Sequence, residues 1–495
     1  MAGLGGPAAG PFCGGSNHPP NGPITRQISR KSQKYPLTGR VFEILARMPN
    51  YPKTNSAAPL PDSLFARFFA PLDAAILQAS GGRNCPVLGD RPWLIAGILR
   101  AIEPVASGRD FLQRFPVLFP ESPGDAEISR GHYFESLKSE RRLRHVSHTA
   151  QLLADAMADP AHDPLASLPG LEDFDVFAGD GHWHEHATHD PRKPRAVRDE
   201  SGAATGATAE SHFAVGHLYG LNLRTGALVH LTAGDEAARR KEHDMRALKR
   251  LEIETLRQGA RKGRKVLWVW DKAGIDFRQW HRWKQGSGIY FLSRLKENMT
   301  LPEEAAEQPW DRADPINAGV ERDALGGSAC GTMLRWVRYR DPISGRVFDF
   351  VTNLLDVPPG IIAQLYRMRW DIEKVFDDVK NKQSEKKAWA TGTVAKTMQA
   401  QLICLAHNLM RLCERWLEVE AGIVNVPERA RRDKRVAALG KALAKQGLRL
   451  PDPWLLTLRF TQIAVKLMRW LRVYLYEKTC LEAALAALRR AYASL

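Results

Sequence analysis

The chain is sparing in the residues and runs that mark secreted and membrane proteins. Its 495 residues include only six cysteines, scattered without a C-x-x-C pair: Cys13, Cys85, Cys330, Cys404, Cys413 and Cys480. That spacing indicates neither a disulfide framework nor a zinc ribbon. No apolar run approaches the roughly 18 residues that a membrane helix needs, and the sequence opens without a basic-then-apolar signal. We therefore expect a cytoplasmic protein with no membrane partner.

Acidic residues are also scarce relative to basic ones. The chain has 71 Lys and Arg against 55 Asp and Glu, which gives a formal net charge of +16 and a pI near 9.6. This balance favours a polyanionic partner, with nucleic acid before a membrane surface. The 44% of hydrophobic residues is typical of a globular protein, and the length predicts two or three domains.

Changes of composition along the chain predict its domains. The first residues combine Gly, Pro and Ala with almost no charge, which predicts a disordered lead-in. Helical segments broken by Pro and Gly follow, then strands, then helices to the end. We predict a lead-in at 1–23, a helical N-terminal domain at 24–168, an α/β core at 169–295 and 350–395, a β-rich insertion at 296–349, and a helical C-terminal region at 396–495.

The middle of the chain predicts an α/β fold built on a mixed sheet. We expect, in order, a strand at 174–179, strands at 211–221 and 227–232 joined by a hairpin, a charged helix at 235–259, an apolar strand at 264–270, a helix at 277–284 and a strand at 289–295. This order is close to the ribonuclease H-like arrangement. Two of the strands stop at an aspartate, Asp180 and Asp271.

After the insertion, Pro358 and Pro359 start a helix that is expected to run to Lys380. At about 100° per residue, Tyr366, Arg369, Glu373 and Lys380 project from one narrow stripe. A buried face is predicted beside it, formed by Leu365, Met368, Ile372, Val375, Phe376 and Val379. Taken alone, the pattern is typical of an amphipathic helix with a solvated charged face.

Three carboxylates of this chain are placed to converge. Asp180 and Asp271 stand at strand ends, where ligands gather in α/β sheets, and Glu373 lies on the helix that returns after the insertion. Paired divalent ions about 3.5–4 Å apart need such oxygen ligands, and Mg²⁺ or Mn²⁺ suits them. We therefore predict a site for two Mg²⁺ or Mn²⁺ ions on Asp180, Asp271 and Glu373.

The spacing Tyr366-x2-Arg369-x3-Glu373-x6-Lys380 resembles the signature of bacterial DDE transposases of the insertion-sequence-4-like family. The segments 352–356 and 365–370, Asp180-Gly181 and the strand-end Asp271 are also similar to that family, so the resemblance covers about residues 125–415. The extra acids at 371, 377 and 378 depart from the signature.

The resemblance implies a function as well as a fold. It implies a ribonuclease H-like catalytic core with a β-rich insertion, a DNA-binding N-terminal domain, and a C-terminal region for dimerisation and DNA contact. It also implies cut-and-paste DNA transposition by a homodimer, which would bind double-stranded transposon ends and target DNA. Such a protein would be bacterial and associated with the nucleoid. Asp180, Asp271 and Glu373 would be the metal ligands, and Tyr366, Arg369 and Lys380 would hold DNA phosphates. In related enzymes a tryptophan of the insertion stacks on a displaced base beside a DNA hairpin, and Trp336 is the candidate here.

Other assignments remain open from the residues alone. Asp175, Asp190 or Asp276 could replace a chosen aspartate, although Asp175 lies within a predicted strand and Asp276 follows a probable turn. A histidine cluster could bind zinc or form a polar loop that touches DNA: His182, His184, His186 and His189. Trp268 and Trp270 are expected in the core.

Three functions follow from these residues. The first is a metal-dependent transposase, an enzyme that cleaves and transfers DNA strands. The second is a catalytically silent DNA-binding protein derived from such an enzyme, and the third is a general nuclease of the same fold. The three carboxylates favour the first, and the helical segments at both ends argue against the third.

Overall fold

The computed structural model describes most of the chain beyond its N-terminal segment. The described residues are 63–83, 89–105, 107–118, 130–182, 196–198, 200–208, 216–234, 244–296, 299, 305–328, 331–383, 388–390, 392–452, 454, 462–476 and 479–493. They all belong to one compact unit, Lys53–Leu495. The other unit, Met1–Pro52, and with it the predicted lead-in at 1–23, lies outside them.

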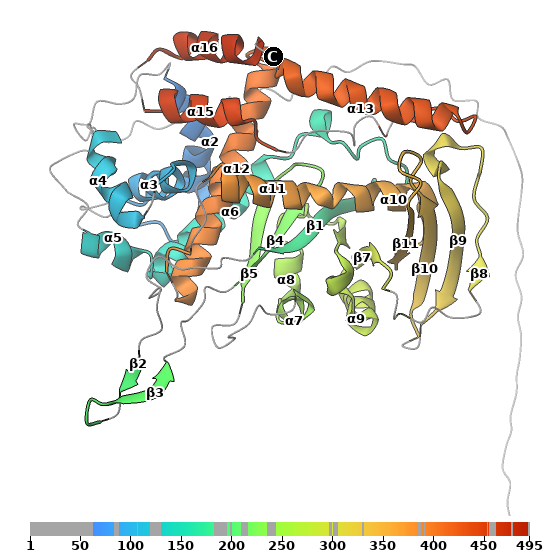
Figure 1. Ribbon diagram of the computed structural model, residues 1–495, viewed down its shortest axis with the longest axis horizontal. Helices are drawn as coiled ribbons and strands as arrows, with labels where there is room; N and C mark the ends of the chain where they lie inside the picture. The colour runs from blue at the N-terminus through green and yellow to red at the C-terminus, as the bar shows by residue number, and fades with distance from the viewer. Residues whose placement is uncertain are drawn as a thin grey trace, which may run out of the picture. The chain divides into compact units, whose positions relative to one another are not determined.

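A nine-stranded mixed sheet runs through this unit (Figure 1). Its strands are β1 Phe174–His182, β4 His217–Asn222, β5 Leu228–Ala233, β6 Lys265–Val269, β7 Ile289–Arg294, β8 Ala306–Glu307, β9 Val320–Gly327, β10 Met333–Arg340 and β11 Val347–Thr352. Their order across the sheet is β5-β4-β1-β6-β7-β11-β10-β9-β8. Two further short strands pair with each other only, β2 Ala196–Arg198 and β3 Ala204–Thr208.

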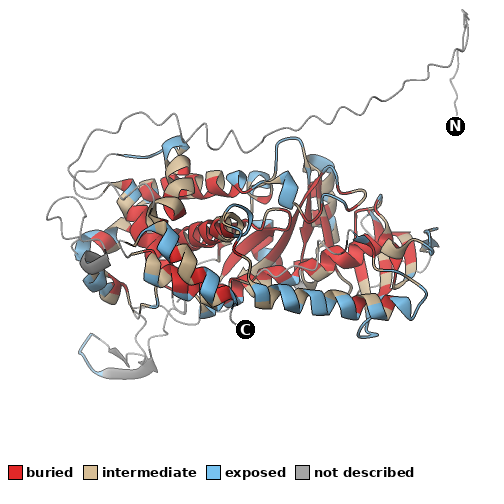
Figure 2. Ribbon diagram, turned by 90° about the horizontal axis from the view of Figure 1, so that it is seen from above, coloured by how far each residue is buried: buried red, intermediate tan, exposed pale blue. Residues whose placement is uncertain are grey.

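The first five strands of this order have the ribonuclease H-like topology predicted from the sequence. A hairpin of β4 and β5 pairs antiparallel with β1, and β6 and β7 follow in parallel. The apolar strand β6 is buried on both faces, because Leu267 and Val269 enter one core while Val266 and Trp268 enter another. Figure 2 shows these strands buried beneath helices.

The β-rich insertion extends the same sheet. β11 pairs antiparallel with β7, and β10, β9 and β8 continue outward from it. The outer edges of the sheet differ. At one end, Asn408 of a long helix accepts a hydrogen bond from the backbone N–H of Leu228 at 2.8 Å and donates one to its carbonyl at 3.1 Å. At the other end, β8 has only two residues.

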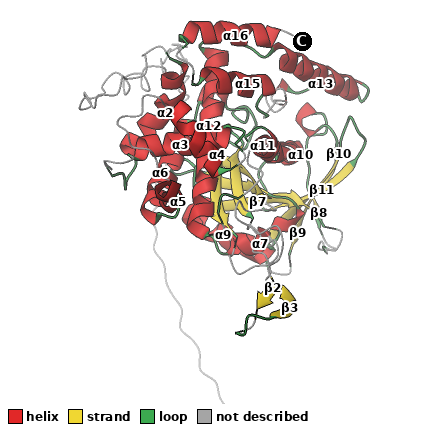
Figure 3. Cartoon of the chain, turned by 60° about the vertical axis from the view of Figure 1, so that its left-hand side comes forward, coloured by secondary structure: helices red, strands yellow, loops and turns green. Residues whose placement is uncertain are grey.

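Helices from the two ends of the chain share one hydrophobic core (Figure 3). They are α2 Leu64–Gln78, α3 Asp90–Ile102, α4 Gly108–Leu118, α5 Arg130–Ser136 and α6 Glu140–Ala156 on one side, and α12 Thr393–Val419, α15 Val465–Tyr474 and α16 Leu481–Ala493 on the other. Leu99 and Leu402, for example, belong to this core. The domain limits at 168 and 396 stay a prediction. Within the described residues, no helix is long and apolar enough to cross a membrane.

Two expectations at the sheet were wrong in detail. β1 continues to His182, so Asp180 lies inside the strand and not at its end, because β4 pairs with β1 as far as His182. The described part of the charged helix expected at 235–259 forms two short helices, α7 Asp244–Lys249 and α8 Ile253–Leu256. The extended backbone of Glu252 separates them. The helix expected at 277–284 is present as α9 Phe277–Ser287.

Candidate active site

Three charged side chains stand at equivalent positions on adjacent parallel strands. The register pairs Ala178 with Val269 and Val269 with Leu292. Two residues further along each strand come Asp180, Asp271 and Arg294, on strands spaced roughly 4.8 Å apart. The Ser293 hydroxyl donates to the Asp271 carbonyl at 2.7 Å, which ties the second strand to the third at this level. Asp180 and Asp271 are therefore brought together as expected.

The sequence analysis missed Arg294. Its signal was available, because Arg294 lies at the end of the predicted strand 289–295, next to the level at which Asp271 follows the predicted strand 264–270. Arg294 is half-buried, and its guanidinium lies 5.1 Å from the ring centroid of Phe348.

The helix expected from Pro358 to Lys380 is two helices, α10 Pro359–Met368 and α11 Trp370–Asn381, which meet at Arg369. The chain tightens at this junction. The N–H of Arg369 donates to the Tyr366 carbonyl, and the N–H of Ile372 donates to the Arg369 carbonyl, each at 3.2 Å and three residues back. A single continuous helix was therefore the wrong prediction, although the direction of the chain is kept because Arg369 retains helical dihedral angles.

The predicted buried face is confirmed. All of its six members are buried in the core against the sheet: Leu365, Met368, Ile372, Val375, Phe376 and Val379. α11 packs against β1 and β4, which fixes its polar edge above Asp180. Lys380 is exposed, one residue before the end of α11.

Arg369 joins the helix to the strand. Its side chain is 5% exposed, and Nη2 donates to Glu373 Oε1 at 2.5 Å while Nη1 lies 3.7 Å from Asp180 Oδ2. The guanidinium also lies 5.7 Å from the ring centroid of Tyr366. Its Nε is buried and has no hydrogen-bond partner among the described residues. One positive group thus draws together two of the three predicted carboxylates.

The surroundings keep Arg369 charged and Tyr366 neutral. Burial by itself disfavours the charged guanidinium, but Tyr366, Glu373 and Asp180 outweigh it and raise the pKa of Arg369. Burial raises the pKa of the Tyr366 phenol, and nearby Asp271 adds to this, against the opposing effect of Arg369 and Arg294. Tyr366 therefore lies within the field of both strand-end charges and offers a hydroxyl proton at neutral pH.

The additional acids on α11 have partners away from this cluster. Asp371 is buried and pairs with Lys374 at 2.8 Å. Asp378 is fully buried, binds Lys382 and accepts a hydrogen bond from the backbone N–H of Ile463 at 2.7 Å. Burial raises the pKa of Asp378 despite these contacts. Asp377 accepts hydrogen bonds from the side chains of Asn381 and Gln462. These residues fasten α11 to its neighbours.

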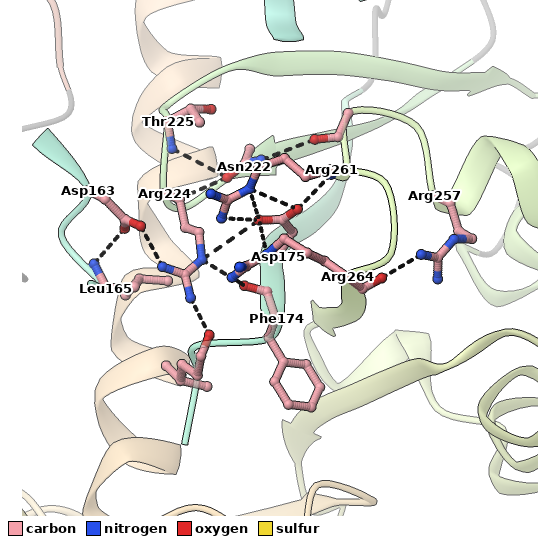
Figure 4. Close-up of polar contacts among 12 residues, drawn as sticks. Asp163, Leu165, Phe174, Asp175, Asn222, Arg224, Thr225, Arg257, Arg261 and Arg264 are labelled. Carbon is pink, nitrogen blue, oxygen red and sulfur yellow. Dashed lines mark hydrogen bonds and ion pairs between the residues drawn. The ribbon is translucent and has the colours of Figure 1, made fainter. Parts of the chain in front are cut away.

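Two of the rival aspartates are engaged elsewhere. Figure 4 shows Asp175 enclosed by arginines; Arg261 binds it through both carboxylate oxygens, and Arg264 and Arg224 approach its Oδ1 to 3.2 and 3.8 Å. Asp276 caps α9 by accepting from the Gln279 N–H at 2.9 Å. Asp190 lies outside the described residues.

The histidine cluster is only partly described. His182 is buried, and its ring centroid lies 4.9 Å from that of Phe376 on α11. His184, His186 and His189 lie outside the described residues. His182 therefore belongs to the packing between β1 and α11, and a zinc role of the cluster stays a prediction.

The tryptophans have distinct roles. Trp268 and Trp270 are buried and stacked on each other at 5.3 Å, as expected of core residues. Trp336 faces away from α10, its Nε1 donates to Asp349 at 2.9 Å, and Arg322 covers its ring at 4.2 Å. The structure does not bring Trp336 to the Arg369 cluster. Trp370, directly after Arg369, is 55% exposed.

The carboxylate oxygens of Asp180, Asp271 and Glu373 are the type of ligand that a hard divalent cation such as Mg²⁺ prefers. The three carboxylates come from neighbouring positions, and the Arg369 guanidinium already places a positive charge between Asp180 and Glu373. In the described part of the chain, no three His, Cys, Asp or Glu side chains are grouped closely enough to hold a metal ion. Glu373 must therefore leave Arg369 before all three carboxylates can share a cation.

Comparison with known proteins identifies this region. Residues 187–409 match the family model described as a transposase DDE domain. The match includes Asp271 and the whole of α10 and α11, and it begins seven residues after Asp180. No curated protein matches the chain. Over residues 187–409 the chain is similar to a transposase DDE domain, and its ribonuclease H-like strand order agrees with that similarity.

Proposed function

We propose that this protein is an enzyme of cut-and-paste DNA transposition, which cleaves and transfers strands at the terminal inverted repeats of an insertion sequence. Water attacks a phosphodiester at each end, and the freed 3′-hydroxyl is the nucleophile of the later strand steps. A homodimer would hold two double-stranded ends and the target DNA. The observation that carries the proposal is the cluster in which Arg369 joins Asp180 of β1 to Glu373 of α11, beside Asp271, which lies two residues past the end of β6.

Asp180, Asp271 and Glu373 would hold two Mg²⁺ or Mn²⁺ ions. When bound, these ions would supply activation of the attacking water and stabilisation of the leaving oxygen. The protein contributes the positions of the three carboxylates. β1 and β6 hold Asp180 and Asp271 side by side, and the packing of α11 on the sheet brings Glu373 over them.

Phosphate binding is assigned to the groups around these carboxylates. Arg369 has a buried Nε without a partner, and Tyr366 keeps its hydroxyl proton, so both can donate to phosphate oxygens. Arg294 adds a second guanidinium at the same level of the sheet. Lys380 is exposed further along α11 and would reach a more distant phosphate.

A stacking surface for a displaced base is better assigned to Trp370 than to Trp336. Trp370 is exposed beside Arg369, whereas Trp336 is held by Asp349 and covered by Arg322. We expect Trp370→Ala to remove the quenching of a 2-aminopurine base placed next to the cleavage point of an end duplex, with Trp336→Phe as the control. Lost quenching in the control alone would return the role to Trp336.

Cleavage of DNA that carries the flanking inverted repeats tests the main proposal. With Mg²⁺ present, Asp180→Ala, Asp271→Ala and Glu373→Ala should each reduce cutting to background and leave end binding in place, since their role is metal ligation. Asp377→Ala removes a carboxylate from the same helix and should retain cutting. A ligand variant that still cuts would overturn that assignment.

One observation favours the alternative of a catalytically silent DNA-binding protein. Arg369 pairs with Glu373 and approaches Asp180, and a derivative that no longer cuts could keep this pairing. The same assay separates the two functions, because a silent protein would bind the ends and cut none of them at any Mg²⁺ or Mn²⁺ concentration.

A further inference from the structure

The helix α13, Val426–Ala444, is attached to the protein along one narrow side. Only Leu439 and Leu443 of its nineteen residues are buried. They form a small core with Ala318, which precedes β9, and with Trp454. Asn425 caps the helix by accepting a hydrogen bond from the Glu428 N–H at 3.4 Å. The other residues of α13 are exposed or half-buried, as Figure 2 shows.

The outward side of α13 is basic along its whole length. Arg431, Lys434 and Lys441, together with Lys445 at the C-cap, fall within about 80° of each other on the helix and roughly opposite Leu439 and Leu443. All four are exposed, and we call them the basic stripe. Alanines 430, 437 and 438 lie between or beside them, so no bulky side chain separates the charges.

Acidic residues of α13 lie off this stripe. Asp433 projects about 80° from its nearest member. Glu428 is half-buried, and burial raises the pKa of its carboxyl. Arg411 and Lys382 oppose this rise more strongly than Arg431 does. Lys434 and Lys441 have no acidic partner within the ion-pair distance of 4.0 Å among the described residues. The stripe is therefore a row of positive charge that the protein itself leaves largely uncompensated.

The dimensions of the stripe suit a nucleic-acid backbone. From Arg431 to Lys445 the helix rises about 21 Å, at 1.5 Å per residue. One strand of duplex DNA presents a phosphate about every 3.4 Å along the axis, so the stripe spans roughly six phosphates. A helix that lies on a membrane surface would instead show large apolar residues beside its charges, and this face has alanine.

α13 is also fixed relative to the helix that carries the candidate active site. Ala318 packs against α13, and Asn317 directly precedes it in the chain. The side chain of Asn317 accepts a hydrogen bond from the N–H of Gly360 in α10 at 3.0 Å. Arg435 of α13 lies close enough to Arg367 of α10 to influence its charge, after the larger effect of burial, which lowers the pKa of Arg367. Figure 1 shows α13 running alongside α10.

We infer that the basic stripe of α13 is a second DNA contact, which binds the phosphate backbone of duplex DNA outside the cleavage site. The inference rests on the proposed function for the nature of its partner. Four phosphate contacts account for a salt-dependence slope of about 3.6, at 0.9 for each contact. They contribute affinity and carry no sequence preference.

Neutralising the stripe tests the inference. The full-length protein with Arg431→Gln, Lys434→Gln, Lys441→Gln and Lys445→Gln is compared with a matched quadruple variant of exposed basic residues on other elements: Lys262→Gln, Arg278→Gln, Arg282→Gln and Arg346→Gln. Binding to a random-sequence duplex of 30 base pairs is measured against salt concentration without divalent metal. The stripe variant should lose about 3.6 units of slope and more than tenfold in affinity, and the control neither.

Each other outcome overturns the inference. An unchanged slope in the stripe variant would show that α13 does not contact the duplex. A loss confined to anionic vesicles, or to a second copy of the protein in sedimentation, would assign the stripe to another partner. Because metal and inverted repeats are absent, failure of the cleavage assay would leave this result unaffected. Circular dichroism checks folding, and glutamine at exposed helix positions retains helix propensity.

Discussion

At the scale of single residues, Arg369 decides the state of the candidate active site. The Arg369 guanidinium binds Glu373 and approaches Asp180. Its positive charge offsets the repulsion between these two carboxylates, as a bound metal ion would. The same contact competes with a metal ion for both groups. Arg369 thus has two roles to reconcile, one toward the carboxylates and one toward the phosphate.

This competition gives a prediction for metal binding. A hydrogen bond to a charged group contributes about 1.5–3 kcal/mol, so its removal in Arg369→Ala should tighten the binding of Mn²⁺ by about tenfold. Isothermal titration calorimetry of the DNA-free protein measures this, with Arg322→Ala at the far edge of the sheet as control. Weaker or unchanged Mn²⁺ binding would mean that Arg369 does not compete. In the same variant, the salt slope of DNA binding should fall by about one.

At the scale of elements, glycines decide how close β1 and β4 come to Trp268 of β6 and to Trp270, which follows this strand. Gly179 and Gly220 are partners in the register of β1 and β4. A Cβ on Gly179 would lie 2.3 Å from the ring of Trp270, and one on Gly220 would lie 2.7 Å from the ring of Trp268. The stacked indoles therefore need both glycines, and Trp270 immediately precedes Asp271.

Gly179→Ala should consequently disturb the site through packing. We expect a loss of about 1–3 kcal/mol in the free energy of unfolding from overpacking, and a fall in cleavage larger than the fall in end binding, because Trp270 must move and Asp271 with it. Thermal unfolding and the cleavage assay measure the two effects. Gly286→Ala is the control, since a Cβ there meets nothing within 4 Å. Equal effects of the two substitutions would contradict this role.

Hydrophobic periodicity and the order of segments in the sequence predicted which helices and strands form. They predicted less well where these elements end. The buried face at 365–379 and the strand 264–270 follow from simple patterns, and the structure confirms both. The junction at Arg369 could not be predicted, because no Pro or Gly marks it and the tightening depends on how two helices fit one sheet. The position of Arg294 at a strand end could be read from the sequence, but the pairing of Arg369 with Glu373 depends on side-chain rotamers, which a single sequence does not specify.

At the scale of the whole molecule, buried histidines link the β5 edge to the helical core. His230 Nε2 of β5 and His217 Nδ1 of β4 share a hydrogen bond at 3.1 Å, and His407 Nε2 of α12 lies 3.1 Å from the Gly226 carbonyl oxygen. Burial lowers the pKa of each, His230 and His407, to about 3. Both rings stay neutral in the folded protein across the physiological range.

Their depressed pKa values predict the pH dependence of stability. The unfolded chain protonates histidine near pH 6.5, so the stabilisation is complete above that pH and declines as pH falls toward 3. Each histidine contributes a loss of about 1.4 kcal/mol per pH unit at most. His230→Gln should therefore show a smaller drop in Tm between pH 7 and pH 5 than the unaltered protein or the exposed His162→Gln. An identical drop would contradict a neutral, buried His230.

The hydrogen bonds of Asn408 to Leu228 have a consequence for assembly. The side-chain amide of Asn408 takes the place of a neighbouring strand at Leu228 of β5. It occupies the Leu228 N–H and carbonyl, which a further strand would need for pairing. The opposite border is a two-residue strand, so among the described residues neither margin presents a long open edge to a strand from another copy. Two copies that meet on DNA would consequently associate through helices, loops or the nucleic acid itself, and the sheet would stay a property of each copy alone.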